Sequence, residues 1–124
     1  MTLPNSIFTD GGVIGPNPTK LGGTWCWCWV TSGVILKHES GVVTPGDMGT
    51  EVVTNNVTEL YAALRALESV PNNWHGTLIS DSMVTLHRLR HSNRWKGVPD
   101  WMRRGPCPVP HGCRAFLLRV AMTP

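Results

Sequence analysis

The sequence predicts a single α/β domain built on a mixed β-sheet with helices packed on it. Alternating apolar residues between positions 24 and 43 predict two antiparallel strands. Apolar residues at helical spacing within 56–69 predict a helix, which lies between a short strand near the N-terminus and another after residue 76. A strand–helix–strand unit of this kind favours parallel pairing of the two strands. A chain of 124 residues with 41% hydrophobic content fits one modest core. The prediction is therefore one domain over residues 1–124.

The first half of the chain should supply three strands of this sheet. "SIFTD" (6–10) is the first expected strand; it ends on Asp10 and leads into a glycine- and proline-rich loop at 12–23. "TWCWCWV" (24–30) and "VILKHESGVV" (34–43) then form an antiparallel hairpin through the three-residue connection "TSG". The first strand should lie at the centre of the sheet.

The clearest helix is expected from about Asn56 to Ser69, after a second loop at 44–53. Its apolar residues recur at helical spacing and place one stripe against the sheet. They are Leu60, Ala63, Leu64 and Leu67. "TLISDS" (77–82) is the next expected strand and ends on Asp81. Because this strand follows a crossover helix, it should pair in parallel with the first one.

The N-terminus and the hydropathy pattern indicate the compartment. The chain start lacks the basic residues and apolar run of a signal peptide, and no stretch approaches the ~20 apolar residues of a membrane span. We therefore expect a cytoplasmic protein with no membrane contact and with reduced thiols.

Four cysteines raise the question of a zinc site. Cys26 and Cys28 alternate with three tryptophans, which is the period of a strand with cysteines on one face and tryptophans on the other. Cys107 and Cys113 flank His111, but structural zinc sites usually show tighter paired spacings. Packing is the preferred role for the cysteines, and zinc is the alternative.

Charge is distributed unevenly along the chain. Residues 1–81 carry three basic and seven acidic residues, whereas residues 82–124 carry eight basic residues and only Asp100. The basic residues concentrate at 86–105, interleaved with Trp95 and Trp101. Such a segment can neutralise phosphates and offer aromatic faces for stacking. A solvated helix face with two buried tryptophans explains the same pattern equally well. Within the segment, we expect the nucleic-acid contacts to come from Arg90, Arg94, Trp95 and Lys96.

The two strand-end aspartates predict a cation site. If their strands lie side by side and parallel, Asp10 and Asp81 emerge at the same edge of the sheet. Carboxylate oxygens suit Mg²⁺ or Mn²⁺, and Gly11 and Gly12 leave room for a metal or a phosphate backbone. Glu59 in the predicted helix is a third candidate ligand. Alternatives are turn chemistry for each aspartate and a capping box from Asn56 to Glu59.

Three stretches resemble the ribonuclease H family of the bacterial and retroviral type: "FTDGG" (8–12), "TNNVTELYAALRALE" (54–68) and "LISDS" (78–82). The middle stretch is the most specific, because the family's first helix opens with Thr-Asn-Asn followed shortly by Glu-Leu. The resemblance is good over residues 1–82. It leaves a basic helical segment at 83–104 and a weakly matched tail at 105–124, where "AFLLRVAM" is a candidate last strand. The stretches "GGVIGPNPTKLGGTW" and "RWKGVPDW" are more similar to compact phage or actinobacterial members.

The resemblance implies a fold, a chemistry and a set of residue roles. The fold is a ribonuclease H-like mixed sheet, and the activity is cleavage of the RNA strand of RNA–DNA hybrids by a monomer. Asp10, Glu59 and Asp81 match the family's catalytic carboxylates, which bind Mg²⁺, with Mn²⁺ as a substitute. Two pairs match the substrate-binding positions: Gly11 and Gly12, whose backbone approaches the RNA strand, and Asn55 and Asn56, which contact the minor groove.

The C-terminal part departs from the family pattern. The family carries a fourth carboxylate on a C-terminal helix, but here no acidic residue follows Asp100, and His111 precedes the candidate last strand instead of following it. The chain is then expected to lack that helix, either as a truncated or frameshifted form or as a minimal three-carboxylate version. Impaired turnover is one consequence. A non-catalytic domain that binds hybrids or other nucleic acids, and a DNA-acting nuclease of the same fold, are the alternative functions.

Overall fold

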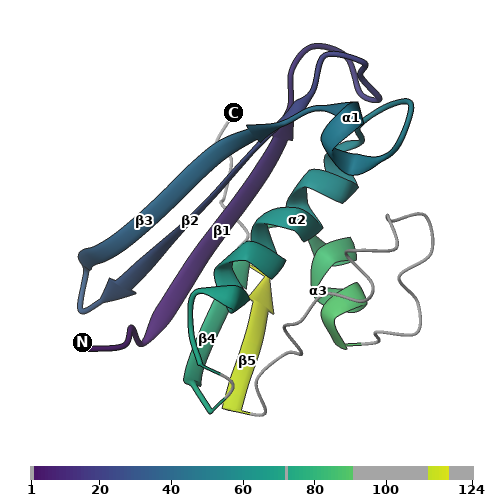
Figure 1. Cartoon of the computed structure of the whole chain (residues 1–124). Helices are drawn as coiled ribbons and strands as arrows, with labels where there is room; N and C mark the ends of the chain where they lie inside the picture. The colour runs from purple at the N-terminus through teal and green to yellow at the C-terminus, as the bar shows by residue number, and fades with distance from the viewer. Residues whose placement is uncertain (1, 72, 91–111, 118–124) are drawn as a thin grey trace, which may run out of the picture.

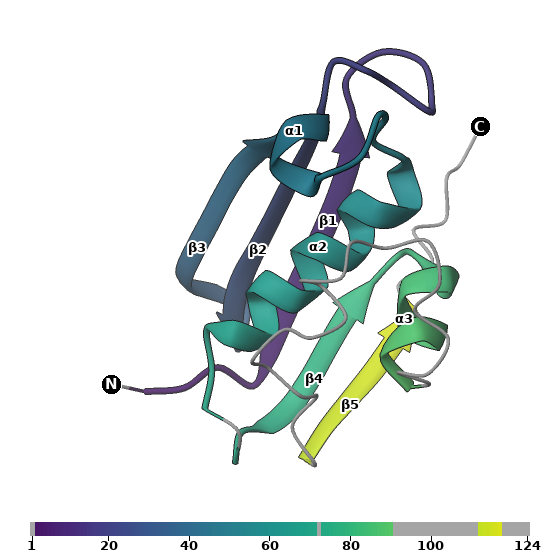
Figure 2. The same ribbon diagram turned by 45° about the vertical axis from the view of Figure 1, so that its right-hand side comes forward.

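The computed structural model describes residues 2–71, 73–90 and 112–117, and for residues 88, 90 and 112–117 it describes the backbone alone. These residues form one five-stranded sheet with the strand order β3-β2-β1-β4-β5 (Figure 1). Helix α2 crosses one face of the sheet, and α3 contacts α2, β4 and β5 (Figure 2). The elements are β1 (Ser6–Val13), β2 (Gly23–Thr31), β3 (Val34–Val43), α1 (Pro45–Met48), α2 (Asn55–Glu68), β4 (His75–Ser80), α3 (Met83–Arg90) and β5 (Gly112–Leu117).

The predicted mixed sheet is confirmed, with β1 at its centre. β1 pairs with β2 in antiparallel register from Ser6 to Val13, but its parallel pairing with β4 covers only residues 6–8. The prediction that the first strand ends at Asp10 is therefore wrong. β1 continues because β2 supplies hydrogen-bond partners along its whole length, whereas the pairing of β1 with β4 stops at Phe8.

The last strand is displaced from the predicted stretch. β5 spans Gly112–Leu117 and pairs in parallel with all six residues of β4, from His75 to Ser80. The expected strand at 115–122 begins three residues too late, and residues 118–124 lie outside the described part of the chain. The position of β5 is set by its pairing with β4. The apolar content on which the prediction rested does not show where that pairing begins.

Two connections differ from the predicted loops. The β2–β3 hairpin turns through two residues, Ser32 and Gly33, both with positive φ (50° and 77°). Such a turn matches the twist of the flanking strands better than the predicted three-residue connection. The expected loop at 44–53 contains the single-turn helix α1. Thr44 and Asp47 close a reciprocal capping box at its start.

The hydrophobic core lies between α2 and the sheet. The predicted apolar stripe of α2 is buried, with exposed fractions of 0–7% at Leu60, Ala63, Leu64 and Leu67. Opposite it, the three tryptophans of β2 are buried, and the indole N–H of Trp29 donates to Ser69 Oγ at 2.8 Å. Aromatic side chains of this size dominate the apolar area that a small domain buries.

The cysteines of β2 lie on the other face of the sheet from its tryptophans, as predicted. Cys26 is exposed and Cys28 is half-buried, and both are free thiols. They therefore do not pack into the α2-covered core, and packing as their preferred role remains a prediction. Cys107 and His111 lie outside the described residues, and of Cys113 only the backbone in β5 is described.

Helix α3 covers the first part of the predicted basic helical segment. It ends at Arg90, and residues 91–104 of that segment lie outside the described part of the chain. Among the helices that are described, none has the length and apolar character needed to cross a membrane.

Candidate metal centre

Asp10 lies where β1 has lost its neighbour on one side. β4 pairs with β1 only as far as Phe8, so two residues later the β4 side of β1 is open. The Asp10 side chain is exposed there, and its Oδ1 accepts a hydrogen bond from the backbone N–H of Gly11 at 3.0 Å. The Asp10 carboxylate at this unpaired side of β1 is therefore accessible to a cation.

Asp81 follows β4 directly and is held by a tight serine-rich turn. The N–H of Ser82 donates to Ser80 Oγ at 3.0 Å, and the N–H of Thr85 donates to Ser82 Oγ at 3.1 Å. The second bond caps the start of α3. Because β1 and β4 are parallel, this turn brings Asp81 to the same edge of the sheet as Asp10, as predicted.

Glu59 lies in the second turn of α2 and comes from the helix-covered side. The N-cap of α2 is Thr54, whose Oγ1 accepts a hydrogen bond from the N–H of Val57 at 3.3 Å. Asn56 is therefore inside the helix, and the capping-box explanation of Glu59 is wrong. Glu59 is only 4% exposed, and its buried Oε2 atom has no hydrogen-bond partner among the described residues.

Gly11 allows the helix to approach the strand closely enough for Glu59 to reach this edge. A Cβ atom at Gly11 would lie 2.5–2.6 Å from backbone atoms of Thr58 and Glu59. The room that this glycine leaves is thus filled by α2 rather than left open to a phosphate. Gly12 faces Thr24, whose Oγ1 would lie 3.2 Å from an added Cβ atom. Backbone contact between these glycines and RNA remains a prediction.

The three carboxylates converge at one point. One ligand oxygen from each of Asp10, Glu59 and Asp81 lies within 4.8 Å of the other two. Burial raises the pKa of Glu59 to about 8, and the charges of Asp81 and Asp10 act in the same direction. Burial and then Asp81 also raise the pKa of Asp10. A bound cation would relieve both effects.

These groups fit a divalent cation. Carboxylate oxygens are the preferred ligands of hard divalent ions, and the unpartnered Oε2 of Glu59 is a buried acceptor that a cation would satisfy. Among the described side chains, this is the only group of three or more His, Cys, Asp or Glu residues whose ligand atoms lie close enough together to hold a metal ion. Cys26 and Cys28 belong to no such cluster, so the zinc alternative gains no support from the described residues.

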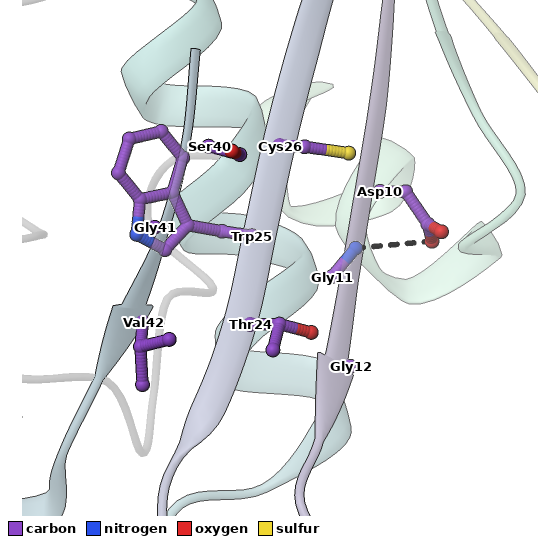
Figure 3. A pocket seen from close by; sticks show the side chains of 9 residues that line it. All are labelled: Asp10, Gly11, Gly12, Thr24, Trp25, Cys26, Ser40, Gly41 and Val42. Carbon is purple, nitrogen blue, oxygen red and sulfur yellow. Dashed lines mark hydrogen bonds between the residues drawn. The ribbon is translucent and has the colours of Figure 1, made fainter.

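Two cavities flank Asp10. The larger, of about 370 Å³, extends from Asp10 across β2 to Ser40 and Val42 on β3 (Figure 3). The smaller, of about 220 Å³, also contains Asp81. Cys26 lines both cavities, because it pairs directly with Asp10 across the β1–β2 ladder. Sequence reasoning placed Cys26 on the correct face, but only the strand register shows that it lies beside the carboxylate.

The other predicted site residues fall into three groups. Asn55 and Asn56 open α2; Asn55 is half-buried and Asn56 is exposed. Arg90 ends α3, and its side chain is not described. The last three predicted contacts lie outside the described residues: Arg94, Trp95 and Lys96. Their contact with nucleic acid remains a prediction.

No family model matches the chain. Its curated relatives include the protein named Ribonuclease H of Yersinia pestis (strain Pestoides F), 32% identical over 105 residues. The match covers 85% of this chain and 58% of that protein, so the chain spans less than two thirds of the relative's length.

Solved structures share the fold. RNase H1 from Halobacterium salinarum superposes with a TM-score of 0.54 at 24% identity, over 80% of this chain and 67% of that one. The N-terminal RNase H domain of a Mycobacterium tuberculosis protein superposes with a TM-score of 0.56 at 19% identity. This match covers 89% of this chain and 77% of that one. These organisms are diverse, so similarity to compact phage or actinobacterial members remains a prediction. In both its sequence and its fold, the chain is similar to ribonuclease H proteins.

Proposed function

We propose that this chain is a metal-dependent endonuclease that hydrolyses the RNA strand of RNA–DNA hybrids. The observation that carries the proposal is the convergence of Asp10, Glu59 and Asp81 within 4.8 Å of one another. Relatives named Ribonuclease H support the substrate class. All three carboxylates come from one chain, which is why we expect a monomer to be sufficient. The free thiols of Cys26 and Cys28 accord with a cytoplasmic protein.

The cation that we propose is Mg²⁺, held by the three carboxylates. When bound, such an ion supplies Lewis-acid activation of water and stabilises charge on the phosphate oxygens. Asp10 and Asp81 are exposed and would meet the scissile phosphate from the open edge of β1. Glu59 is buried and would anchor the ion from the helix side. To do so it must give up the proton that its raised pKa favours at neutral pH.

We assign substrate recognition to the start of α2 and to the basic segment at 86–105. The exposed Asn56 and the half-buried Asn55 offer amide groups at the start of α2 for the minor groove of the hybrid. The basic segment at 86–105 would neutralise phosphates without reading sequence. Recognition of hybrid shape and of 2′-hydroxyl groups explains how a protein of this kind acts without a sequence motif.

Cleavage of labelled duplexes by the purified 124-residue chain tests the proposal. The RNA–DNA hybrid, the double-stranded DNA and the double-stranded RNA should share one sequence, and Asp81→Asn supplies the blank. We expect cleavage of the RNA strand of the hybrid alone, above the blank. Binding of the hybrid without any cleavage would identify a non-catalytic binding domain, and cleavage of the DNA duplex would identify a DNA-acting nuclease. Either result would overturn the proposal.

A further inference from the structure

We propose that the chain forms a dimer in which the outer edge of β3 pairs in antiparallel register with β3 of a second copy. β3 is the first strand in the order β3-β2-β1-β4-β5, and no other described strand pairs with its outer side. Figures 1 and 2 both show it at the border of the sheet. Such an edge presents unpaired N–H and C=O groups to another strand. The inference is independent of the proposed function, because each copy keeps its own three carboxylates.

The edge strand is long, and its first part is apolar. β3 has ten residues, whereas strands of globular domains commonly have five or six. Val34, Ile35 and Leu36 form a consecutive run with exposed fractions of 58%, 61% and 44%, and Val42 near the other end is 60% exposed. A run of three exposed apolar residues is rarely left uncovered unless it has a function. A second strand alongside β3 would remove these side chains from water.

The charges at the middle of β3 favour a second copy of this chain as the partner. Lys37 and Glu39 lie on either side of His38 in the sequence. Both point to the helix-covered face of the sheet, since their partners on β2 are the buried Trp29 and Trp27. A two-fold axis at His38 places Lys37 of each copy directly opposite Glu39 of the other. Opposite charges in such cross-strand pairs are stabilising.

The same two charges oppose the neighbouring registers. Side chains that lie opposite each other in a sheet belong to the same face, so the two-fold axis passes through a residue and not between two residues. Moving the axis from His38 to Lys37 would place the two Lys37 side chains opposite each other. Moving it to Glu39 would do the same for the two glutamates. Like charges directly opposite are destabilising, so β3 favours one register.

Both charged side chains are available for the pairing. The ammonium group of Lys37 lies 5.2 Å from the ring centroid of Trp29, and Lys37 is exposed. Arg65 donates to Glu39 Oε1 at 2.7 Å, but the Glu39 side chain remains 43% exposed. Glu39 can therefore accept a second cation from the other copy without losing Arg65.

A bulge limits the length of the interface. Trp29 pairs with Lys37, but the next residue of β2, Val30, pairs with Ile35, so Leu36 is an extra residue in β3. A bulge increases the local twist of a strand. The regular pairing is thus confined to the residues around His38, and the apolar run at 34–36 lies alongside residues 40–42 of the second copy. An interface of this size predicts a weak dimer.

Sedimentation equilibrium of the purified 124-residue chain measures the association, in reducing buffer because Cys26 and Cys28 are free thiols. We expect a monomer–dimer equilibrium with a Kd of about 10–100 μM, as for a small transient interface. Lys37→Glu puts like charges opposite each other in both pairs and should weaken dimerisation about 10-fold or more. Lys20→Glu is the matched control, because Lys20 is exposed, lies outside β3 and changes the net charge equally.

The charge-swapped variant Lys37→Glu/Glu39→Lys tests the partner and the register together. It restores both opposite-charge pairs only around an axis at His38, and should return the Kd to within about threefold of the unmutated value. Melting temperatures show whether the variant is folded, because Glu39→Lys also removes the ion pair with Arg65. If it is not, Lys37→Glu against Lys20→Glu decides alone.

Three results would overturn the inference. The first is a chain that stays monomeric at concentrations well above the expected Kd. The second is a dimer that Lys37→Glu and Lys20→Glu weaken equally or not at all, since the copies would then meet through another surface. The third is a folded charge-swapped variant that dimerises no better than Lys37→Glu.

Discussion

Gly11 and Glu59 are in direct backbone contact: a Cβ atom on Gly11 would lie 2.6 Å from the backbone nitrogen of Glu59. This contact joins the strand that carries Asp10 to the helix that carries Glu59. The spacing of the carboxylates therefore depends on a residue that has no side chain. Its substitution is the first test of how the site is built.

Gly11→Ala should push α2 away from β1, because neither backbone can move alone. We expect a loss of about 1–3 kcal/mol in the free energy of unfolding, typical of overpacking, together with weaker divalent-cation binding. Chemical denaturation and calorimetric metal titration measure the two effects. Gly46→Ala in α1 is the control, because its nearest neighbour would lie at an ordinary 3.6 Å. If the two variants lost the same free energy of unfolding and the same cation affinity, the close contact between Gly11 and α2 would be ruled out.

Asp10→Asn should raise the melting temperature of the metal-free protein by a few degrees. Without a cation, Asp10 and Asp81 repel each other, and removing one charge relieves that repulsion. Calorimetry in the presence of a chelator measures the shift. An unchanged or lower melting temperature would argue against a carboxylate cluster.

The stability of the metal-free protein should fall as pH rises from about 5 to 8. The folded chain keeps a proton on Glu59, whose pKa is raised to about 8, whereas the unfolded chain releases it near the ordinary value of 4.5. In that window the folded state binds the extra proton, so rising pH favours unfolding; above pH 8 this contribution is constant. Melting temperatures across the range, compared with those of Glu59→Gln, isolate the effect. Parallel curves for the two proteins would contradict it.

Replacement of Arg90, Arg94 and Lys96 by alanine should weaken the salt dependence of hybrid binding. Phosphate contacts release condensed counterions, so each lost contact lowers the slope of log affinity against log salt by about 0.9. Affinities at four or more salt concentrations give the slope. An unchanged slope would assign these residues to a solvated face of the protein.

Turnover should depend on the choice of metal. Three carboxylates hold one ion well, whereas two-metal catalysis needs a second ion about 3.5–4 Å away. Beyond Asp100 this sequence has no further acidic residue to hold it. We expect slow hybrid cleavage in Mg²⁺ and faster cleavage in Mn²⁺, measured as single-turnover rates against the Asp81→Asn blank. Rapid cleavage in Mg²⁺ would show that a fourth carboxylate is dispensable here.

Sequence patterns were sufficient for the parts of the fold that local chemistry determines. The alternation of Trp25 and Cys26 placed them on opposite faces of β2, and the stripe that includes Leu60 located the buried side of α2. The parallel pairing of the strand that carries Asp10 with the strand that precedes Asp81 followed from the crossover helix. These features depend on periodicity and on short-range connection rules, which one sequence displays.

The remaining features depend on contacts between distant segments, which periodicity does not report. The capping of α2 by Thr54 instead of Asn56, the contact of Gly11 with Glu59 and the hydrogen bond from Asn55 to Asn17 are of this kind. Each requires the register of the strands and the position of the helix to be known first. The sequence showed which residues carry the chemistry but not what holds them together.

The central claim, that Asp10, Glu59 and Asp81 share one divalent cation, is tested most directly by calorimetric titration of Mn²⁺ at pH 7 in two buffers of different ionisation enthalpy. Because Glu59 is protonated at this pH without metal, ion binding should release close to one proton, and both the release and most of the affinity should disappear in Glu59→Gln. The account would be contradicted if Mn²⁺ bound to the unmutated chain without proton release and bound to Glu59→Gln with the same affinity.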